Sequence, residues 1–342
     1  IFVIIALNEQ RMQPRNYKRG MSMAKYYIGI DGGGSKTKFL CFDRVGRECG
    51  SATTIGTYCA QDGIDAVLRR LKDGISQCLP EEATDVLIGF GMPAYGENRE
   101  MDALAVQKIC EACSPMKVHI DNDAAIGWAG SLAMEPGISV VAGTGSIAYG
   151  RDASGKKERC GGWHEFFSDE GSGYWLGKQL LQFFSQQSDG RLEKTPLYEL
   201  VRNELDLRDD FDIISLTNQH YANSRKDTAA LQKILLEAAR MGDPHAISCY
   251  DRASEELSKL ILAVLNKLDF PQMVSVSYQG GLFSIPDLIR NPVAHKVRAA
   301  TLPRKIDFCQ PKLDPCRGAV LLAMAELEPE NLETMRINFS QG

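Results

Sequence analysis

The chain has 342 residues, of which 44% are apolar and 24% charged, and its formal net charge is −5 at pH 7. This composition is typical of a globular protein, and the length allows two domains of ordinary size. The acidic balance argues against a nucleic-acid partner or an anionic membrane surface, because both usually select a basic excess. The first apolar run, Ile1–Leu7, is far shorter than the roughly 20 residues that span a bilayer. We therefore expect residues 1–23 to be a tail and the protein to be cytoplasmic, with no membrane partner.

Ten cysteines are spread along the chain. Cys110 and Cys113 form a Cys-x-x-Cys pair near a predicted helix end, with no second pair at the spacing of a zinc site. The five histidines are also scattered. Thiols kept reduced in the cytosol are therefore the simplest interpretation of the cysteines.

The pattern of apolar residues predicts the elements in chain order. The first part of the chain reads as strands at 26–31, 37–43, 48–54, 85–92 and 116–121, with helices at 63–78, 101–113 and 124–134. A strand–glycine–strand unit at 138–150 opens the second part, which continues as mainly helical sequence from about 175 to 268, strands at 273–279 and 305–309, and a helix at 315–327. This order predicts two related α/β lobes, the second with a helical insertion; it leaves the strand order open.

The first candidate ligand-binding segment runs from Asp31 to Lys38, with the sequence DGGGSKTK. Consecutive glycines let backbone N–H groups approach an anion closely, and the serine and lysine add donors. A P-loop is excluded because Gly34 is followed by serine instead of lysine, and a dinucleotide-binding fingerprint is excluded because Thr37 replaces its third glycine. Both motifs also open a helix, whereas a strand is predicted here. A glycine turn in a β-hairpin remains, either holding phosphate or serving as a plain turn.

The same arrangement occurs again at the start of the second part of the chain. An apolar strand runs into the sequence GTGS at Gly143–Ser146, and the chain then returns as a strand. A tight hairpin without a ligand is the alternative here too. Two glycine hairpins, each opening a lobe, nevertheless favour a phosphate site between the lobes.

A cluster of polar residues at 121–123 marks the junction of a predicted strand and a helix. Asp and Asn are good helix N-caps, so capping is one explanation. The other is a carboxylate at the carboxyl end of a strand, where α/β sheets place their ligands. Such a carboxylate could accept the proton of a sugar hydroxyl, and one residue can cap the helix while its neighbour faces the ligand.

The segment from Cys160 to Trp175 combines two of the three tryptophans with an acidic pair and several glycines. An apolar ring surface and acceptors for hydroxyl groups are what a sugar site requires. The alternative is a rigid loop with Trp163 in the core.

Together these four segments resemble the N-acetylglucosamine kinase group of the BadF/BadG/BcrA/BcrD ATPase family, within the actin–hexokinase–Hsp70 superfamily. The resemblance extends from about Tyr26 to Ala325 and includes matching segments at 242–244, 280–281 and 318–319. It implies two ribonuclease-H-like lobes, at 24–122 and 123–319, with a cleft between them. The last helix, at about 320–340, would pack back on the first lobe. The implied activity is ATP-dependent phosphorylation of the 6-hydroxyl of N-acetylglucosamine, by a homodimer.

The resemblance also implies roles for individual residues. Phosphate and Mg²⁺ would be bound by Asp31 (through water), Gly33, Gly34, Ser35, Lys36, Thr144 and Gly145. The adenosine would be bound by Ala239, Gly280, Gly281 and Ser284. Asp123 would be the catalytic base, and the sugar would be surrounded by Asp123, Ser146, Gly162, Trp163, Asp169 and Gly173.

The sequence departs from this family pattern in the sugar segment. Ile147 stands where an asparagine would meet the sugar, His164 and Glu165 replace a Gly-His pair, and Tyr58 lies near the position of another sugar-contacting asparagine. Glucosamine, N-acetylmuramic acid and glucose therefore remain alternative substrates. Two other functions stay open: an iron–sulfur ATPase activator, in which Cys160 or Cys110 and Cys113 would bind the cluster, and a sugar-sensing regulator without catalysis.

Overall fold

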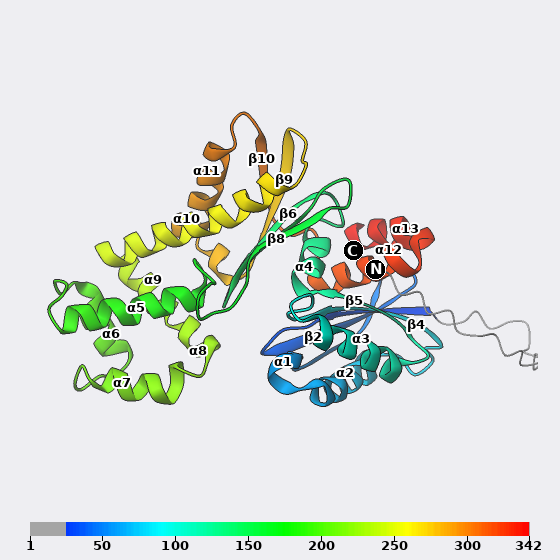
Figure 1. Ribbon diagram of the computed structural model, residues 1–342, viewed down its shortest axis with the longest axis horizontal. Helices are drawn as coiled ribbons and strands as arrows, with labels where there is room; N and C mark the ends of the chain where they lie inside the picture. Colours follow the sequence, from blue (N-terminus) through cyan, green and yellow to red (C-terminus); the bar gives the residue numbers. More distant parts are fainter. Residues whose placement is uncertain (1–24, 342) are drawn as a thin grey trace, which may run out of the picture.

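The computed structural model describes residues 25–341, so the predicted tail at 1–23 lies outside the described residues. The described chain forms two lobes, each built on a five-stranded sheet with helices packed against it (Figure 1). The predicted α/β class and two-lobe architecture are confirmed.

The first lobe contains the sheet order β3-β2-β1-β4-β5. β1 pairs antiparallel with β2 and parallel with β4, and β5 continues the parallel half. The elements of this lobe are the strands β1 (Lys25–Asp31), β2 (Lys36–Asp43), β3 (Glu48–Ile55), β4 (Asp85–Met92) and β5 (Lys117–Asn122), and the helices α1 (Cys59–Asp62), α2 (Ile64–Cys78) and α3 (Arg99–Cys113).

The second lobe repeats this arrangement with the order β10-β9-β6-β7-β8, in which β6 takes the place of β1. Its strands are β6 (Gly137–Ala142), β7 (Ser146–Arg151), β8 (Lys157–Gly161), β9 (Met273–Gln279) and β10 (Lys305–Cys309). The predicted helical insertion lies between β8 and β9 and consists of α5 (Gly173–Ser188), α6 (Pro196–Glu204), α7 (Asp212–Leu216), a π-helical turn (Thr217–Tyr221), α8 (Arg225–Ala230), α9 (Gln232–Arg240) and α10 (Pro244–Lys267). After β9 follow two short helical turns (Gly281–Ser284 and Pro286–Arg290) and α11 (Asn291–Ala300).

Apolar residues on both faces of the first sheet explain why helices cover it on both sides. Alternate side chains such as Ile28 and Phe39 pack on the face of α2 and α3, while Tyr27 and Leu40 pack with α12 (Pro315–Leu327) and α13 (Pro329–Gln341). The alternation follows from the two-residue period of a strand. The C-terminal helices thus lie against the first sheet, although they follow the second lobe in sequence (Figure 1).

Two helices cross at the junction of the lobes, α12 and α4 (Asp123–Ser131). Their backbones touch: a Cβ added to Gly318 would lie 2.1 Å from the carbonyl oxygen of Ile126, and one added to Gly130 would lie 2.4 Å from that of Asp314. The amide of Leu313 also donates to the Gly130 carbonyl at 3.1 Å. Glycine is therefore required sterically at both crossing positions.

The structure contains elements that were not predicted, such as α1 and α11, and two further differences have a clear physical cause. β8 was not predicted, because its charged residues Lys157, Glu158 and Arg159 hide the apolar alternation; β8 is an edge strand, where charge is tolerated. The last helix, predicted in one place at 315–327 and in another at about 320–340, is two helices. The chain breaks at Glu328, since Pro329 disfavours helical geometry in the residue before it.

Candidate functional site

The first glycine turn comprises residues 32–35 between β1 and β2. Hydrogen bonds to neighbouring backbone fix one side of the turn, and the other side is open. The amide of Gly32 donates to the carbonyl of Gly91 at 3.0 Å, and the Gly33 carbonyl accepts from the amide of Thr57 at 3.0 Å. Gly34 has open space where a side chain would stand, and Ser35 and Lys36 are exposed. The turn therefore presents a free surface to an anion, with its own backbone fixed.

The second turn, residues 143–145 between β6 and β7, is held by the N-terminus of α5. The Gly143 carbonyl accepts from the amide of Gly173 at 2.8 Å, and the Thr144 carbonyl accepts from the amide of Tyr174 at 3.2 Å. Ser172 caps α5 by accepting from the amide of Trp175. Thr144 itself is exposed, whereas Gly173 is buried with its N–H already used. In this structure Gly173 supports the turn.

Asp123 is the first residue of α4 and lies between the lobes. Asn122 is the N-cap: its side chain accepts from the amide of Ala124 at 2.9 Å and donates to the Tyr95 carbonyl at 2.8 Å. One oxygen of Asp123 is also 2.9 Å from the Ala124 amide nitrogen. Because Asn122 already caps the helix, the Asp123 carboxylate is not needed for that task.

The Asp123 carboxyl group resists ionisation. Burial raises its pKa to about 7, and the negative charges of Asp31 and Glu97 add to the rise, while the Ala124 N–H and Arg159 oppose it. A carboxylate that ionises near neutral pH is suited to accept a proton.

Asp31 ends β1 beside the first glycine turn. Burial raises its pKa to about 6, the Asp314 carboxylate raises it further, and Lys38 and Lys36 lower it. Two carboxylates at such a position repel each other unless a cation lies between them. Asp314 forms an ion pair with Arg317, so a cation already lies beside one carboxylate of this pair.

The sugar segment combines buried and exposed residues. The alternative that Trp163 lies in the core is not observed: this side chain is 70% exposed, and its neighbours Phe166 (85%) and Phe167 (68%) are exposed too. Asp169 is buried and has a left-handed backbone, with φ of 64°. It accepts from the amide of Ser146 at 3.2 Å, which attaches this segment to the second glycine turn.

An ion pair bridges the two lobes next to this segment. Arg159 on β8 contacts Glu97, which precedes α3, with 2.9 Å between Nη2 and Oε1. The same nitrogen donates to the Gly162 carbonyl at 3.0 Å. Gly162 needs a left-handed backbone (φ 63°), and a Cβ there would come within 2.8 Å of Ile147.

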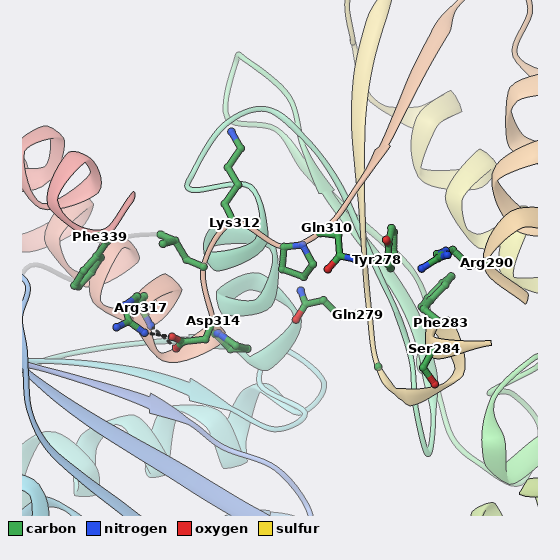
Figure 2. Close-up of a pocket in the computed structure, with 14 residues that line it drawn as sticks. Tyr278, Gln279, Phe283, Ser284, Arg290, Gln310, Lys312, Asp314, Arg317 and Phe339 are labelled. Atoms are coloured by element: carbon green, nitrogen blue, oxygen red, sulfur yellow. Dashed lines mark hydrogen bonds and ion pairs between the residues drawn. The ribbon is translucent and has the colours of Figure 1, made fainter. Parts of the chain in front are cut away.

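A cavity of about 790 Å³ lies between the end of β9 and the segment that joins β10 to α12 (Figure 2). Gly280, Phe283 and Ser284 line one side, and Lys312 and Asp314 line the other. Of the predicted adenosine residues, Gly280 and Ser284 thus face the cavity. Gly281 is exposed next to it, and Ala239 is buried at the end of α9.

Four charged residues near the site were not predicted from the sequence: Glu97, Arg159, Arg225 and Asp314. Asp314 was detectable in principle, because an Asp before a Pro-initiated helix is a cap signal, and it does accept from the Arg317 amide. The other three lie far in sequence from their partners, so no local pattern indicates them.

The two lobes, the paired glycine turns and the ionisable Asp123 between them define the class of ATP-dependent phosphotransferases with an actin-like fold. The profile of the BadF/BadG/BcrA/BcrD ATPase family matches residues 28–323. The chain belongs to this family, as its resemblance implied.

Similar proteins cover almost the same length. N-acetyl-D-glucosamine kinase of Dictyostelium discoideum is 29% identical over 87% of this chain and 97% of its own. N-acetylmuramic acid/N-acetylglucosamine kinase of Clostridium acetobutylicum is 30% identical over 89% of this chain and 100% of its own. The crystal structure of a candidate N-acetylglucosamine kinase from Chromobacterium violaceum has a TM-score of 0.69 at 25% identity, and covers 88% of this chain and 100% of its own.

Among the residues that the structure describes, no helix combines the length and apolar character needed to cross a membrane. Within residues 25–341 there is likewise no group of three or more His, Cys, Asp or Glu side chains placed to hold a metal ion.

Proposed function

We propose that this chain is an ATP-dependent amino-sugar kinase that transfers the γ-phosphoryl group of ATP to the 6-hydroxyl of N-acetylglucosamine. The proposal rests on the placement of Asp123, whose carboxylate lies between the lobes. This carboxylate is not needed to cap α4, because the Asn122 side chain already accepts from the Ala124 amide. The kinases named above are similar over most of both chains, and this supports a sugar as the acceptor.

Asp123 would orient the 6-hydroxyl and accept its proton as the new bond to phosphorus forms. General-base assistance of this kind contributes on the order of 10²–10⁴-fold. The N–H groups of Gly33, Gly34 and Gly145, with the donors of Ser35 and Thr144, would bind phosphate oxygens. Fixed donors are effective here because phosphoryl transfer depends chiefly on alignment and on neutralising charge.

Mg²⁺ would neutralise charge on the β- and γ-phosphates. The chain offers it Asp31, whose carboxylate has Asp314 as a like-charged neighbour, so a divalent cation, held through water, fits this position. A single carboxylate with water is common for Mg²⁺ bound together with a nucleotide.

The nucleotide's adenosine would occupy the cavity beside Gly280 and Ser284. On the sugar side, Ser146, Gly162, Trp163 and Asp169 would surround the ring. Glucosamine, N-acetylmuramic acid and glucose are the competing acceptors, since Ile147 and Glu165 depart from the family pattern in this wall. We also propose a homodimer, magnesium dependence and a cytoplasmic location, where ATP is supplied.

The test is an ADP-release assay with the purified chain, MgATP and a panel of the four sugars. Asp123→Asn serves as the matched control for background ATPase activity. The proposal predicts the highest kcat/KM for N-acetylglucosamine and a phosphate ester at its 6-position, located by NMR of the product. ADP release that no sugar stimulates would refute the kinase assignment, whereas a preference for another sugar would correct the substrate alone. Light scattering of the same sample tests the dimer.

A further inference from the structure

Arg225 brings a positive charge to the sugar segment. It is the first residue of α8, in the helical insertion, and Ser224 caps that helix by accepting from the amide of Asp227. The guanidinium forms an ion pair with Asp169 through Nη2, and its Nη1 lies 3.6 Å from Oε2 of Glu165. The helical insertion therefore places a cation beside Asp169, although the two residues are 56 positions apart in the sequence.

The guanidinium also lies against the second glycine turn. A Cβ added to Gly145 would be 3.0 Å from Nη2 of Arg225 and 3.0 Å from Oδ2 of Asp169. Asp169 uses its other oxygen, Oδ1, to accept from the Ser146 amide. Arginine, carboxylate and turn thus form one contact group, at the place where the phosphate and sugar parts of the proposed site meet.

The first lobe faces the same group. Burial raises the pKa of Tyr58, and the charges of Glu97 and Glu165 add to this rise while Arg225 opposes it. Tyr58 therefore lies within electrostatic range of Arg225 across the gap between the lobes. The Arg225 side chain is 43% exposed, so its guanidinium is accessible to a ligand.

A carboxylate and a guanidinium together satisfy a sugar hydroxyl completely. A hydroxyl has one proton to donate and lone pairs to accept with, an ionised carboxylate only accepts, and a guanidinium only donates. Asp169 and Arg225 use one contact on each other, and each keeps further capacity: the carboxylate has about four acceptor sites and the guanidinium five N–H donors.

We propose that Arg225 is a further sugar-binding residue, which donates a hydrogen bond to the same ring hydroxyl that donates to Asp169. The inference rests on the proposed function. It also accounts for Glu165, one of the departures from the family pattern: this residue is the second counter-ion of Arg225. The Lys178 ammonium donates to the Glu165 carbonyl at 3.2 Å, which attaches the Glu165 backbone to α5.

The experiment compares wild type, Arg225→Lys and Arg225→Gln with N-acetylglucosamine and its 3-deoxy and 4-deoxy analogues. Lysine keeps the charge but loses the planar fork of donors. A hydrogen bond to a charged group is worth about 10- to 100-fold in binding. We therefore expect both variants to lose about 10- to 100-fold in kcat/KM on N-acetylglucosamine, mainly through KM for the sugar, with KM for ATP unchanged.

The deoxy analogues separate binding from a structural role. For the analogue that lacks the contacted hydroxyl, wild type and variants should have the same kcat/KM within about threefold, because the bond no longer exists to be lost. Lys226→Gln removes an exposed cation from the same helical turn and should leave all three sugars unaffected. Thermal unfolding of each variant monitors the fold.

An equal loss on all three sugars, or no loss on any, would overturn the role of Arg225 while leaving the kinase assignment intact. A wild-type enzyme that phosphorylates none of them would overturn both.

Discussion

Asn122 and Asp123 divide two tasks between neighbouring residues. Asn122 supplies the acceptor for the Ala124 amide, and Asp123 is left with a carboxyl group whose pKa burial raises to about 7. The sequence alone could predict that one residue caps while its neighbour faces a ligand, because both are good caps. It could not predict the raised pKa, which depends on how the two lobes enclose the side chain.

Replacing Asp123 with asparagine should abolish most of the turnover and spare binding. The amide keeps the size of the side chain but cannot accept a proton, so we expect kcat to fall by on the order of 10²–10⁴. KM for the sugar should change less than about threefold. Steady-state kinetics with purified protein provide the measurement, and a variant with near wild-type kcat would show that another group is the base.

The activity of the wild type should rise with pH around neutrality. The base must be ionised, and the pKa of Asp123 is raised to about 7, so log kcat/KM should rise with pH below about 7 and level off above it. A profile that is flat from pH 5.5 to 8.5, measured with saturating MgATP, would contradict this assignment.

The carboxyl groups of Asp31 and Asp123 predict how the stability of the fold changes with pH. In the folded protein, burial raises the pKa of Asp31 to about 6 and of Asp123 to about 7. The folded state therefore holds these protons more tightly than the unfolded chain does. Their contribution to stability is full below pH 4 and is lost as pH rises through about 6 to 7.

We expect Asp123→Asn to be more stable than wild type at pH 8, by on the order of 1 kcal/mol or more, and closer to wild type at pH 4.5. Denaturant melts at both pH values give the comparison, and an equal difference at the two would refute it.

At the scale of elements, the two glycine turns differ from plain hairpins in how their backbones are held. Gly32 is enclosed: a Cβ there would lie 2.5 Å from the Gly91 carbonyl oxygen and 2.9 Å from Pro93. Gly34, two residues on, meets nothing within 4 Å. The glycine run in the sequence does not distinguish these two positions, since the distinction comes from β4.

Gly32→Ala and Gly34→Ala form a matched pair. The first should lower the free energy of unfolding by about 1–3 kcal/mol, because the methyl group must displace backbone. The second should leave stability unchanged within about 0.5 kcal/mol, since exposed substitutions without strain have small effects. Urea denaturation measures both, and equal losses would indicate that the close contact at Gly32 is not decisive.

Strands and helices could be predicted from the sequence where their buried apolar residues follow a clear pattern. β4 and β9 have the predicted bounds because the buried residues of β4 form one run and those of β9 follow the alternation of a strand. β8 was missed because an edge strand carries its charges openly. Which segments carry an internal repeat could be inferred from the two glycine hairpins, but the shared strand order required the structure.

For the whole molecule, the Glu97–Arg159 ion pair joins the lobes across the proposed cleft. Arg159 also donates to the Gly162 carbonyl, so one side chain contacts both the first lobe and the sugar segment. We expect closure of the lobes over the sugar, shielding the phosphoryl group from water. The boundaries of the lobes along the chain, 24–122 and 123–319, remain a proposal.

Breaking this pair should weaken sugar binding. We expect Glu97→Gln and Arg159→Gln each to raise KM for the sugar by about two- to tenfold, and the double variant to be no worse than Arg159→Gln alone, because Glu97 acts through its ion pair with Arg159. Steady-state kinetics on the four proteins complete the cycle. Strictly additive effects would show that the two side chains act separately.

We expect the two lobes to rotate relative to each other about the crossing of α4 and α12. The chain passes between the lobes beside two glycines, Gly130 and Gly318, where backbone meets backbone without an intervening side chain. A rotation of a few degrees about this crossing would move the distant sugar segment much farther than it would move the crossing residues. A single methyl group added at either glycine would therefore push α4 and α12 apart. We therefore expect substitutions at Gly130 and Gly318, which lie outside the proposed ATP and sugar sites, to disturb the alignment of the substrates.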